Sequence, residues 1–385
     1  MKLTANDYIK ATKRIEKSAA WKYQTQQYVL NRLTEISKLK KAVDHGIYQP
    51  GKPNEFILCE QGRRRLIKAL PIQDMVLQHA LVNTIILPTL KPYLIHDNGA
   101  GIKGKGISFT RRRFEQHLHW FYRRHAWNGY ALTIDFRKYF DNIDHDIMLD
   151  MLERKIKDKE VMNLLRKIFH SYRVDISFDP DLKNKIFNSL DYYRIPKSEL
   201  TGKAYMHKSL GIGAPISQIL GVFYPTPIDM WCKTVRGIHC YDAYMDDRII
   251  LHPSKLYLEK LFKEIIDIAG RLGIHVNYHK TQIIKLSHGF TWLKTRYILA
   301  PSGKIIKKIP RDVVTRERRK MKALARAGKY DILKEQYKSW RGDKKRYNAF
   351  HTIRNLDKLY KELIADGRKR NETANYQPGH HHSRK

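Results

Sequence analysis

Two adjacent acidic residues, Asp246 and Asp247, lie between two short apolar runs at residues 240–244 and 249–251. Two such runs on either side of a tight turn predict a β-hairpin with both carboxylates at its tip. Adjacent carboxylates repel each other unless water or a cation neutralises them. A solvated turn is the ordinary explanation for the pair, because Asp is common in turns. A metal site is the alternative, and it requires further acidic residues nearby.

A third acid, Asp135, follows the apolar run Ala131–Ile134, which predicts a strand. An acid at the end of a strand can meet the hairpin acids across a sheet. Three carboxylates at one place suit two Mg²⁺ ions, because Mg²⁺ prefers oxygen ligands and shares its shell with substrate phosphates. Two such ions stabilise the attacking and leaving oxygens of a phosphoryl transfer. On its own, Asp135 would be an ordinary surface acid.

A glycine-rich segment precedes the hairpin and has the sequence Gly211-Ile212-Gly213-Ala214-Pro215-Ile216-Ser217-Gln218. Glycines there allow the backbone to approach a nucleotide or a template base closely. A loop that simply caps a helix, with Ser217 as the N-cap residue, explains the same segment equally well.

The charge balance indicates the class of partner. The 385 residues include 74 Lys and Arg against 38 Asp and Glu, a formal net charge of +36. This excess attracts polyanions and argues against an ordinary enzyme of small metabolites. Neither a run of about 18 apolar residues nor a secretion-type N-terminus is present, so nucleic acid is favoured over a membrane. Three scattered cysteines argue against disulfides or a zinc site and suit the cytoplasm.

The order of predicted elements gives the fold class. From residue 130 to residue 300 the pattern is strand, helix, helix, strand-turn-strand, helix and strand, which predicts an α+β fold with helices on one face of a sheet. Two short strands, residues 56–59 and 65–70, are expected upstream. Residues 305–365 are basic and helical, whereas residues 171–208 are polar and aperiodic.

Taken together, these motifs resemble those of the reverse transcriptases. The run Tyr244-Met245-Asp246-Asp247 is similar to the catalytic tetrad of that family, and residues 135–145 resemble its first catalytic motif, especially in the group II intron form. The resemblance implies catalysis with two Mg²⁺ ions, or Mn²⁺ in their place, bound by Asp135 and Asp246 with assistance from Asp247. Phe140 falls where the family keeps an aromatic steric gate that favours dNTPs over rNTPs.

The resemblance covers residues 56–300 and implies further contacts. The loop Gly99–Gly106 resembles the second fingers motif, residues 273–281 resemble the motif whose lysine lies near the triphosphate, and residues 289–293 resemble the primer grip. The implied nucleotide-binding residues are Arg65, Lys103, Phe136, Phe140, Gln218 and Lys280. The implied template and primer contacts are Gly213, Pro215, Ser217, Tyr244, Met245, Trp292 and Leu293.

The implied architecture is the right-hand polymerase fold, an α+β arrangement of fingers, a palm with an antiparallel sheet backed by helices, and a helical thumb. The expected divisions are a basic helical extension (1–50), fingers (51–129), palm (130–300, with an insert at 171–208), thumb (301–370) and a flexible tail (371–385).

The sequence departs from the family pattern at three places. Ile212 stands where most relatives have glutamine, a form that resembles the enzymes of diversity-generating retroelements and of phage defence. Loss of that hydrogen-bonding group implies reduced fidelity. Ile102 stands at a usual arginine, which leaves Lys103 or Lys105 to meet the phosphates, and Lys294 stands at a usual glycine of the primer grip.

The basic flanks predict contact with nucleic acid rather than a merely solvated helix. A basic helix at residues 108–127 is expected to face the template. In residues 305–365, aromatic side chains interleave with the basic ones, and we expect them to stack on bases or to pack against a sheet. These aromatic residues are Tyr330, Tyr337, Trp340, Tyr347 and Phe350.

Three functions remain open on the sequence. The first is a reverse transcriptase that copies a dedicated, structured non-coding RNA into cDNA, in antiviral defence or as a domesticated retroelement. The second is the mutagenic enzyme of a diversity-generating retroelement, and the third is a non-catalytic RNA-binding protein on a polymerase scaffold. The expected partners are dNTPs, the RNA template, the cDNA product, and either a small accessory protein or a second copy of the chain. No membrane partner is expected.

Overall fold

The computed structural model describes residues 3–60, 63–175 and 205–374. Helices and antiparallel strands are mixed along the chain, which agrees with the α+β class predicted from the sequence. The chain divides into two compact units. Unit 1 comprises Met1–Phe114, Leu132–Ile250 and Leu256–Gln282, and unit 2 comprises Glu115–Ala131, Leu251–Lys255 and Ile283–Lys385. Most of the predicted insert (176–204) and of the predicted tail (375–385) lies outside the described residues.

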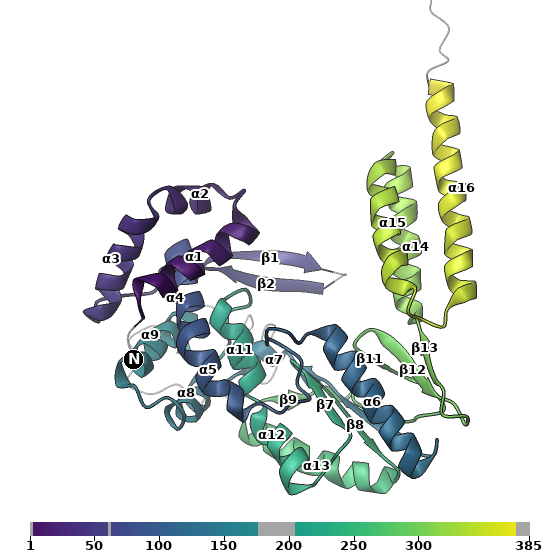
Figure 1. Cartoon of the computed structure of the whole chain (residues 1–385), viewed down its shortest axis with the longest axis horizontal. Coiled ribbons are helices and arrows are strands. Elements are labelled where there is room, and N and C mark those ends of the chain that lie inside the picture. The colour runs from purple at the N-terminus through teal and green to yellow at the C-terminus, as the bar shows by residue number, and fades with distance from the viewer. Residues whose placement is uncertain (1–2, 61–62, 176–204, 375–385) are drawn as a thin grey trace, which may run out of the picture. The chain divides into compact units, whose positions relative to one another are not determined.

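Unit 1 begins with helices where the sequence predicted a basic helical extension. They are α1 (Ala5–Ala19), α2 (Tyr23–Leu30) and α3 (Arg32–Asp44). All three contact α4 (Ile72–Leu81) (Figure 1). A fully buried acid of α4, Asp74, holds the chain that follows α3. Its carboxylate accepts hydrogen bonds from the Tyr48 hydroxyl at 2.7 Å and from the Gly51 N–H at 2.8 Å.

The two strands predicted upstream form a two-stranded antiparallel ribbon, β1 (Asn54–Glu60) and β2 (Arg63–Ala69). The helix that follows is interrupted by a π-helical turn. Its parts are α4, η1 (Val82–Ile86), α5 (Leu87–Leu90) and the 3₁₀ turn η2 (Lys91–Tyr93). Pro88 lies two residues after the π turn, and a proline removes one of the N–H groups that a continuous α-helix needs.

Part of unit 1 is built on a sheet in which β8 lies between β3 and β7. Three of the four strands of this sheet are β3 (Tyr130–Ile134), β7 (Tyr241–Tyr244) and β8 (Asp247–His252). Two short antiparallel ladders pair β4 (Phe136–Arg137) with β9 (His275–Val276) and β5 (Val174–Asp175) with β6 (Tyr205–Met206). The helical segments are α7 (Tyr139–Asn142), α8 (His145–Glu153), α9 (Lys159–Tyr172), α11 (Pro215–Phe223), α12 (Thr226–Met230), the π turn η5 (Trp231–Val235) and α13 (Lys255–Arg271).

Local sequence explains where these helices begin and which faces they bury. The Asp144 carboxylate accepts hydrogen bonds from the first N–H groups of α8, and Asp158 does the same for α9. On α13 the buried residues recur at three- and four-residue spacing, as predicted for an amphipathic helix: Leu258, Leu261, Ile265, Ile268 and Ala269. Ala214, not Ser217, is the N-cap residue of α11, because Pro215 occupies its first position.

Unit 2 contains a three-stranded antiparallel sheet followed by three helices. Its elements are the C-terminal part of α6 (Ile107–His125), most of β10 (Gln282–Lys285), β11 (Phe290–Trp292), β12 (Thr295–Leu299), β13 (Ile305–Lys308), α14 (Arg311–Arg326), α15 (Tyr330–Lys344) and α16 (Phe350–Ala374). Among the described residues, no helix combines the length and apolar character needed to cross a membrane.

Two of the aromatic residues expected to stack on bases or to pack against a sheet are buried in unit 2, Tyr337 in the core of the α14–α16 bundle and Tyr347 in a neighbouring cluster with Ile309 and Ala349. Tyr337 is 3% exposed, and its ring stacks on Tyr360 with centroids 4.7 Å apart. Tyr347 is 7% exposed and hydrogen-bonds to Thr295. A buried ring cannot stack on a base, so base stacking is excluded for these two residues. Tyr347 follows the other expectation, because Thr295 belongs to the strand β12 of the sheet. Phe350, at the start of α16, is exposed.

Candidate active site

The hairpin predicted around Asp246 and Asp247 is present. β7 and β8 pair with Tyr244 opposite Asp247, so Met245 and Asp246 form a two-residue turn. Met245 has a φ of 55°, in the left-handed region that glycine favours in such turns. The two carboxylates and the side chains of Tyr244 and Met245 are half-buried.

The third acid joins this turn from the neighbouring strand. Asp135 directly follows β3, which lies beside β8 in the sheet. Burial raises the pKa of Asp246, and the charge of Asp135 adds to that effect. Burial also raises the pKa of Asp247 to about 7, with further contributions from the charges of Asp246 and Asp135. The structure therefore brings the three predicted carboxylates into one electrostatically coupled site.

Asp135 is held by the segment that follows β9. The Asn277 amide donates to Oδ2 of Asp135 at 2.9 Å, and the Lys280 ammonium lies 3.0 Å from the same atom. The Thr281 hydroxyl accepts from the Asp135 N–H at 3.3 Å, and the Asn277 N–H donates to the Asp135 carbonyl at 2.7 Å. Lys280, expected near a triphosphate, therefore lies beside one of the three predicted catalytic acids. Asn277 and Thr281, which belong to the same 273–281 motif as Lys280, hold Asp135 in position.

The donor set of this site suits Mg²⁺. It consists of carboxylate oxygens, the hard ligands that Mg²⁺ prefers, with no thiol or imidazole among the three residues. Burial, with a smaller contribution from the charges of the neighbouring acids, raises the pKa of Asp246 and of Asp247, so their ionised forms need a compensating positive charge. A divalent cation would supply that charge, and the chemistry of the three carboxylates suits such an ion.

The two phenylalanines of the first motif have different environments. Phe136 is 3% exposed and pairs with Val276 in the β4–β9 ladder, so its side chain is not available to a nucleotide. This corrects the expected side-chain contact, because β4 turns the ring into the core beneath the site. Phe140 is half-buried on α7, and its ring lies against the backbone of Gly221 on α11.

The remaining residues of the first motif are structural. Asp144 caps α8, and the His145 ring makes a 2.6 Å hydrogen bond to the Ser209 carbonyl. Burial lowers the pKa of His145 to about 4, so the imidazole is neutral and must donate its Nε2–H to that carbonyl. The Asn142 amide donates to the Arg137 carbonyl. These contacts hold the chain between Asp135 and α8 against the segment that leads to α11.

The glycine-rich segment before α11 lies beside β2. The Lys68 N–H donates to the Ile212 carbonyl at 3.2 Å, and Gly213 has a φ of 107°, which requires glycine. Lys68 is only 9% exposed, and its charge lowers the pKa of the nearby Asp141, which burial raises. Arg65, the predicted nucleotide ligand, is exposed on β2 opposite Leu58. Because strand residues alternate between faces, Lys68 and Arg65 point to opposite sides.

Within α11 and its N-terminus, the predicted template and nucleotide contacts differ in exposure. Pro215 is half-buried, Ser217 is 2% exposed, and Gln218 and Gly213 are exposed. A Cβ added to Gly101, in the glycine-rich fingers loop, would lie 3.3 Å from Val222 and 3.8 Å from Gln218. The fingers loop therefore runs against α11 close to Gln218.

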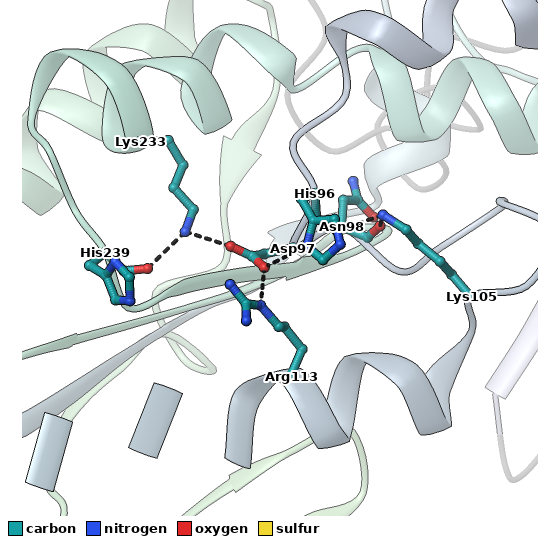
Figure 2. A network of polar contacts seen from close by, with 7 residues as sticks. All are labelled: His96, Asp97, Asn98, Lys105, Arg113, Lys233 and His239. Carbon is teal, nitrogen blue, oxygen red and sulfur yellow. Dashed lines mark hydrogen bonds and ion pairs between the residues drawn. The ribbon is translucent and has the colours of Figure 1, made fainter. Parts of the chain in front are cut away.

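The start of the glycine-rich loop Gly99–Gly106 is hydrogen-bonded to β7. The Ala243 N–H of β7 donates to the Asp97 carbonyl at 3.1 Å, and the Gly99 N–H donates to the Ala243 carbonyl at 3.3 Å. Figure 2 shows the buried Asp97 carboxylate between Arg113 and Lys233, with the Lys233 ammonium at 2.7 Å. These contacts join the loop to α6 and η5.

The two lysines of the loop have different surroundings. The Lys105 ammonium donates to the His96 carbonyl at 2.6 Å (Figure 2), so it stabilises the loop itself. Burial lowers the pKa of Lys105, which is consistent with that internal role. Lys103 is exposed, and of the two it is the one whose ammonium can reach a phosphate without breaking the loop.

Residues 52–297 match the family described as reverse transcriptase (RNA-dependent DNA polymerase), and this match covers more than half of the chain. The chain belongs to the reverse transcriptase family. Protein YkfC of Escherichia coli (strain K12) is 25% identical to it over 185 residues, which is 43% of this chain and 45% of that protein. The aligned part therefore spans less than half of that relative. The family match includes all three carboxylates and ends in β12.

The predicted primer-grip residues of this reverse transcriptase lie in unit 2. Trp292 ends β11, Leu293 opens the turn to β12, and both are less than 10% exposed. Leu293 and Lys294 have φ values of 45° and 60°, so the turn has two left-handed residues. Such a turn favours glycine, which explains why a glycine is usual where this chain has Lys294.

Proposed function

We propose that this chain is an RNA-directed DNA polymerase that copies a dedicated, structured non-coding RNA into cDNA. The observation that carries the proposal is the meeting of Asp135, Asp246 and Asp247 beside the β7–β8 turn. This set suits nucleotidyl transfer, in which a primer 3′-hydroxyl attacks the α-phosphate of a dNTP and pyrophosphate leaves. Two Mg²⁺ ions bound by these carboxylates would stabilise the charge on the attacking and leaving oxygens.

The surrounding residues support a nucleotide site next to the carboxylates. The Lys280 ammonium is partly exposed beside Asp135 and can bind a triphosphate oxygen. Lys103 and Gln218 are exposed on the fingers loop and on α11, which lie against each other. Phe140 supplies an aromatic ring five residues after Asp135, and we propose that it excludes the ribose 2′-hydroxyl.

The template and primer are proposed to follow the predicted contacts at Gly213, Pro215, Ser217, Tyr244, Met245, Trp292 and Leu293. The buried side chains among them, Ser217 and Trp292, would act by shaping the backbone that the nucleic acid meets. The formal net charge of +36 supports a polyanionic partner such as a template–primer duplex.

Two biological roles are proposed for the copied RNA. Antiviral defence, or a domesticated retroelement, is the first, and it is supported by the resemblance of the Ile212–Gln218 segment to defence-associated enzymes. Mutagenic copying in a diversity-generating retroelement is the second role. It is supported by the same segment, because Ile212 replaces a glutamine that would hydrogen-bond near the template, and its loss implies reduced fidelity. A non-catalytic RNA-binding scaffold is disfavoured, because the three carboxylates have no need to meet in such a protein.

Primer extension on an RNA template with Mg²⁺ tests the proposed chemistry. Asp246→Ala should abolish dNTP incorporation, whereas Asp150→Ala, which removes an acid that is 61% exposed on α8, should leave it intact. Unchanged activity in Asp246→Ala would overturn the site. Phe140→Ala should admit rNTPs, and a wild-type enzyme that already prefers rNTPs would overturn the steric gate.

Sequencing the nucleic acids that co-purify with the protein separates the two roles. A bound structured RNA together with short repetitive cDNA supports defence. A long cDNA with errors concentrated at adenines supports diversification.

A further inference from the structure

A buried arginine lies directly beneath the catalytic turn. Arg248 follows Asp247 on β8, and its side chain is 0% exposed. A guanidinium remains ionised in proteins, and a buried charge is unfavourable unless it is paired and hydrogen-bonded. None of the motifs described above uses this residue, so its position requires another explanation.

The guanidinium contacts three parts of the site. Its Nη1 donates to the Met245 carbonyl in the turn, and its Nε lies 3.3 Å from Oδ1 of Asp229 on α12. Its Cζ lies 5.3 Å from the centroid of the Phe136 ring, a distance typical of a cation–π contact. Arg248 therefore joins the residue before Asp246 to the residue after Asp135.

The acid that pairs with Arg248 is itself held in place. Asp229 is 1% exposed, and its Oδ1 also accepts a 2.6 Å hydrogen bond from the Tyr241 hydroxyl. Tyr241 belongs to β7 and is fully buried. The contacts therefore run from α12 through both strands of the hairpin to the turn, and each member of this network is buried except the turn itself.

We propose that Arg248 is a positioning residue that fixes the spacing of the three catalytic carboxylates. The left-handed conformation of Met245 is unfavourable for a residue with a Cβ, and the hydrogen bond to its carbonyl holds the peptide that leads into Asp246. The contact with Phe136 sets the other boundary of the site, next to Asp135. This inference rests on the proposed function, because it concerns the same carboxylates.

Arg248→Lys is the principal test, since lysine keeps the charge but lacks the planar group that can contact Asp229, Met245 and Phe136 together. The Mg²⁺ concentration for half-maximal dNTP incorporation should rise by roughly 10- to 100-fold, the range seen when a group supporting a metal ligand is lost. The increase in thermal midpoint caused by Mg²⁺ should shrink in parallel. A folded Arg248→Lys protein with the wild-type Mg²⁺ dependence would overturn the proposal.

Two tyrosine variants form a matched pair that separates positioning from general stability. Tyr241→Phe removes the hydroxyl that bonds to buried Asp229 at 2.6 Å, and Tyr48→Phe removes the hydroxyl that bonds to buried Asp74 at 2.7 Å. Both variants should lower the thermal midpoint, because each removes one hydrogen bond that a buried carboxylate accepts. Only Tyr241→Phe should raise the Mg²⁺ requirement, and equal effects in the two variants would contradict the proposed role.

The thermal shift caused by Mg²⁺ also tests the positioning role of Arg248 independently of polymerase activity. If the wild-type protein binds Mg²⁺ but extends no primer, and Arg248→Lys weakens the thermal shift, the positioning role stands and the polymerase assignment fails. If polymerase activity is present and Arg248→Lys and Tyr241→Phe both keep the wild-type Mg²⁺ dependence, the polymerase assignment stands and the positioning role fails.

Discussion

Gly221 on α11 packs closely against Phe140, the proposed steric gate. A Cβ added to Gly221 would lie 2.8 Å from Cε1 of Phe140, closer than real Cβ contacts. The Gly221 carbonyl also accepts a 2.6 Å hydrogen bond from the Tyr139 hydroxyl. Both aromatic residues of α7 thus lie against the backbone of α11 at this position, and any side chain there would displace the Phe140 ring.

Gly221→Ala should therefore change sugar selection. We expect the ratio of kcat/KM for dNTPs to that for rNTPs to change by about 10-fold, the size of a one-methyl misfit in a pocket. Single-nucleotide incorporation measures this ratio. The control is Gly270→Ala on α13, where an added Cβ meets nothing within 4 Å. An unchanged ratio in Gly221→Ala would show that α11 does not set the position of Phe140.

The pKa of Asp247 predicts a pH-dependent metal affinity. Burial and the charges of Asp246 and Asp135 raise this pKa from 3.8 to about 7, so without Mg²⁺ the stability that Asp247 contributes is lost as pH rises toward 7. Mg²⁺ needs the ionised form and must displace the proton at lower pH. The thermal shift caused by Mg²⁺ should be larger at about pH 8 than at about pH 6.

Thermal unfolding at several pH values, with and without Mg²⁺, tests this expectation. Asp247→Asn removes the titrating group and should reduce the pH dependence of the shift. Equal shifts at low and high pH in the wild-type protein would indicate that Asp247 is already ionised, and that its neighbours do not raise its pKa.

At the scale of elements, backbone strain in unit 2 is found in the turn between β11 and β12. Lys294 has a φ of 60° in the β11–β12 turn, whereas Lys304, before β13, is not among the residues with positive φ. A left-handed residue with a Cβ costs about 1–2 kcal/mol relative to glycine. Lys294→Gly should therefore raise the free energy of unfolding of unit 2 by about 1 kcal/mol.

Chemical denaturation of the full chain, followed through a probe in unit 2, measures this change. Lys304→Gly is the matched control and should lower stability by about 0.5–1 kcal/mol, because glycine has more freedom in the unfolded chain. If both variants destabilise the protein, the left-handed conformation of Lys294 is not the source of strain.

For the whole molecule, the distribution of charge predicts where nucleic acid binds. Helix α14 carries seven basic side chains against two acidic ones, whereas α13 carries four against three. Removing Arg319 and Lys322 from α14 should weaken binding to an RNA–DNA duplex and reduce the slope of log K against log salt concentration by about 1–2. Fluorescence anisotropy across a series of KCl concentrations measures both quantities.

The control removes two exposed lysines with the same spacing on α13, Lys260 and Lys263. Their substitution by alanine changes the net charge equally but should leave the slope nearly unchanged, because the mixed charges of α13 do not select a polyanion. Equal losses from the two helices would show that overall charge, and not the α14 surface, determines binding.

The sequence alone determined the chemistry and the local elements of this protein. The resemblance of Asp135, the Gly211–Gln218 segment and Asp246-Asp247, in that order, to reverse transcriptase motifs predicted a polymerase site, because each motif is a short run of residues that can be compared directly. Apolar spacing and turn residues also predicted most strands and helices of unit 1. These properties depend on neighbours within a few positions, so they can be recognised before the chain folds.

Only the tertiary structure decided which side chains support that site. Arg248 and Asp229 lie 19 residues apart, and Asn277 meets Asp135 across 142 residues. The burial of Phe136 and Tyr337, and the approach of Phe140 to Gly221, likewise depend on how distant elements pack. A local sequence pattern cannot predict such pairs. The free energy of burying a charge or an aromatic ring depends on its partners, and only the folded chain brings those partners together.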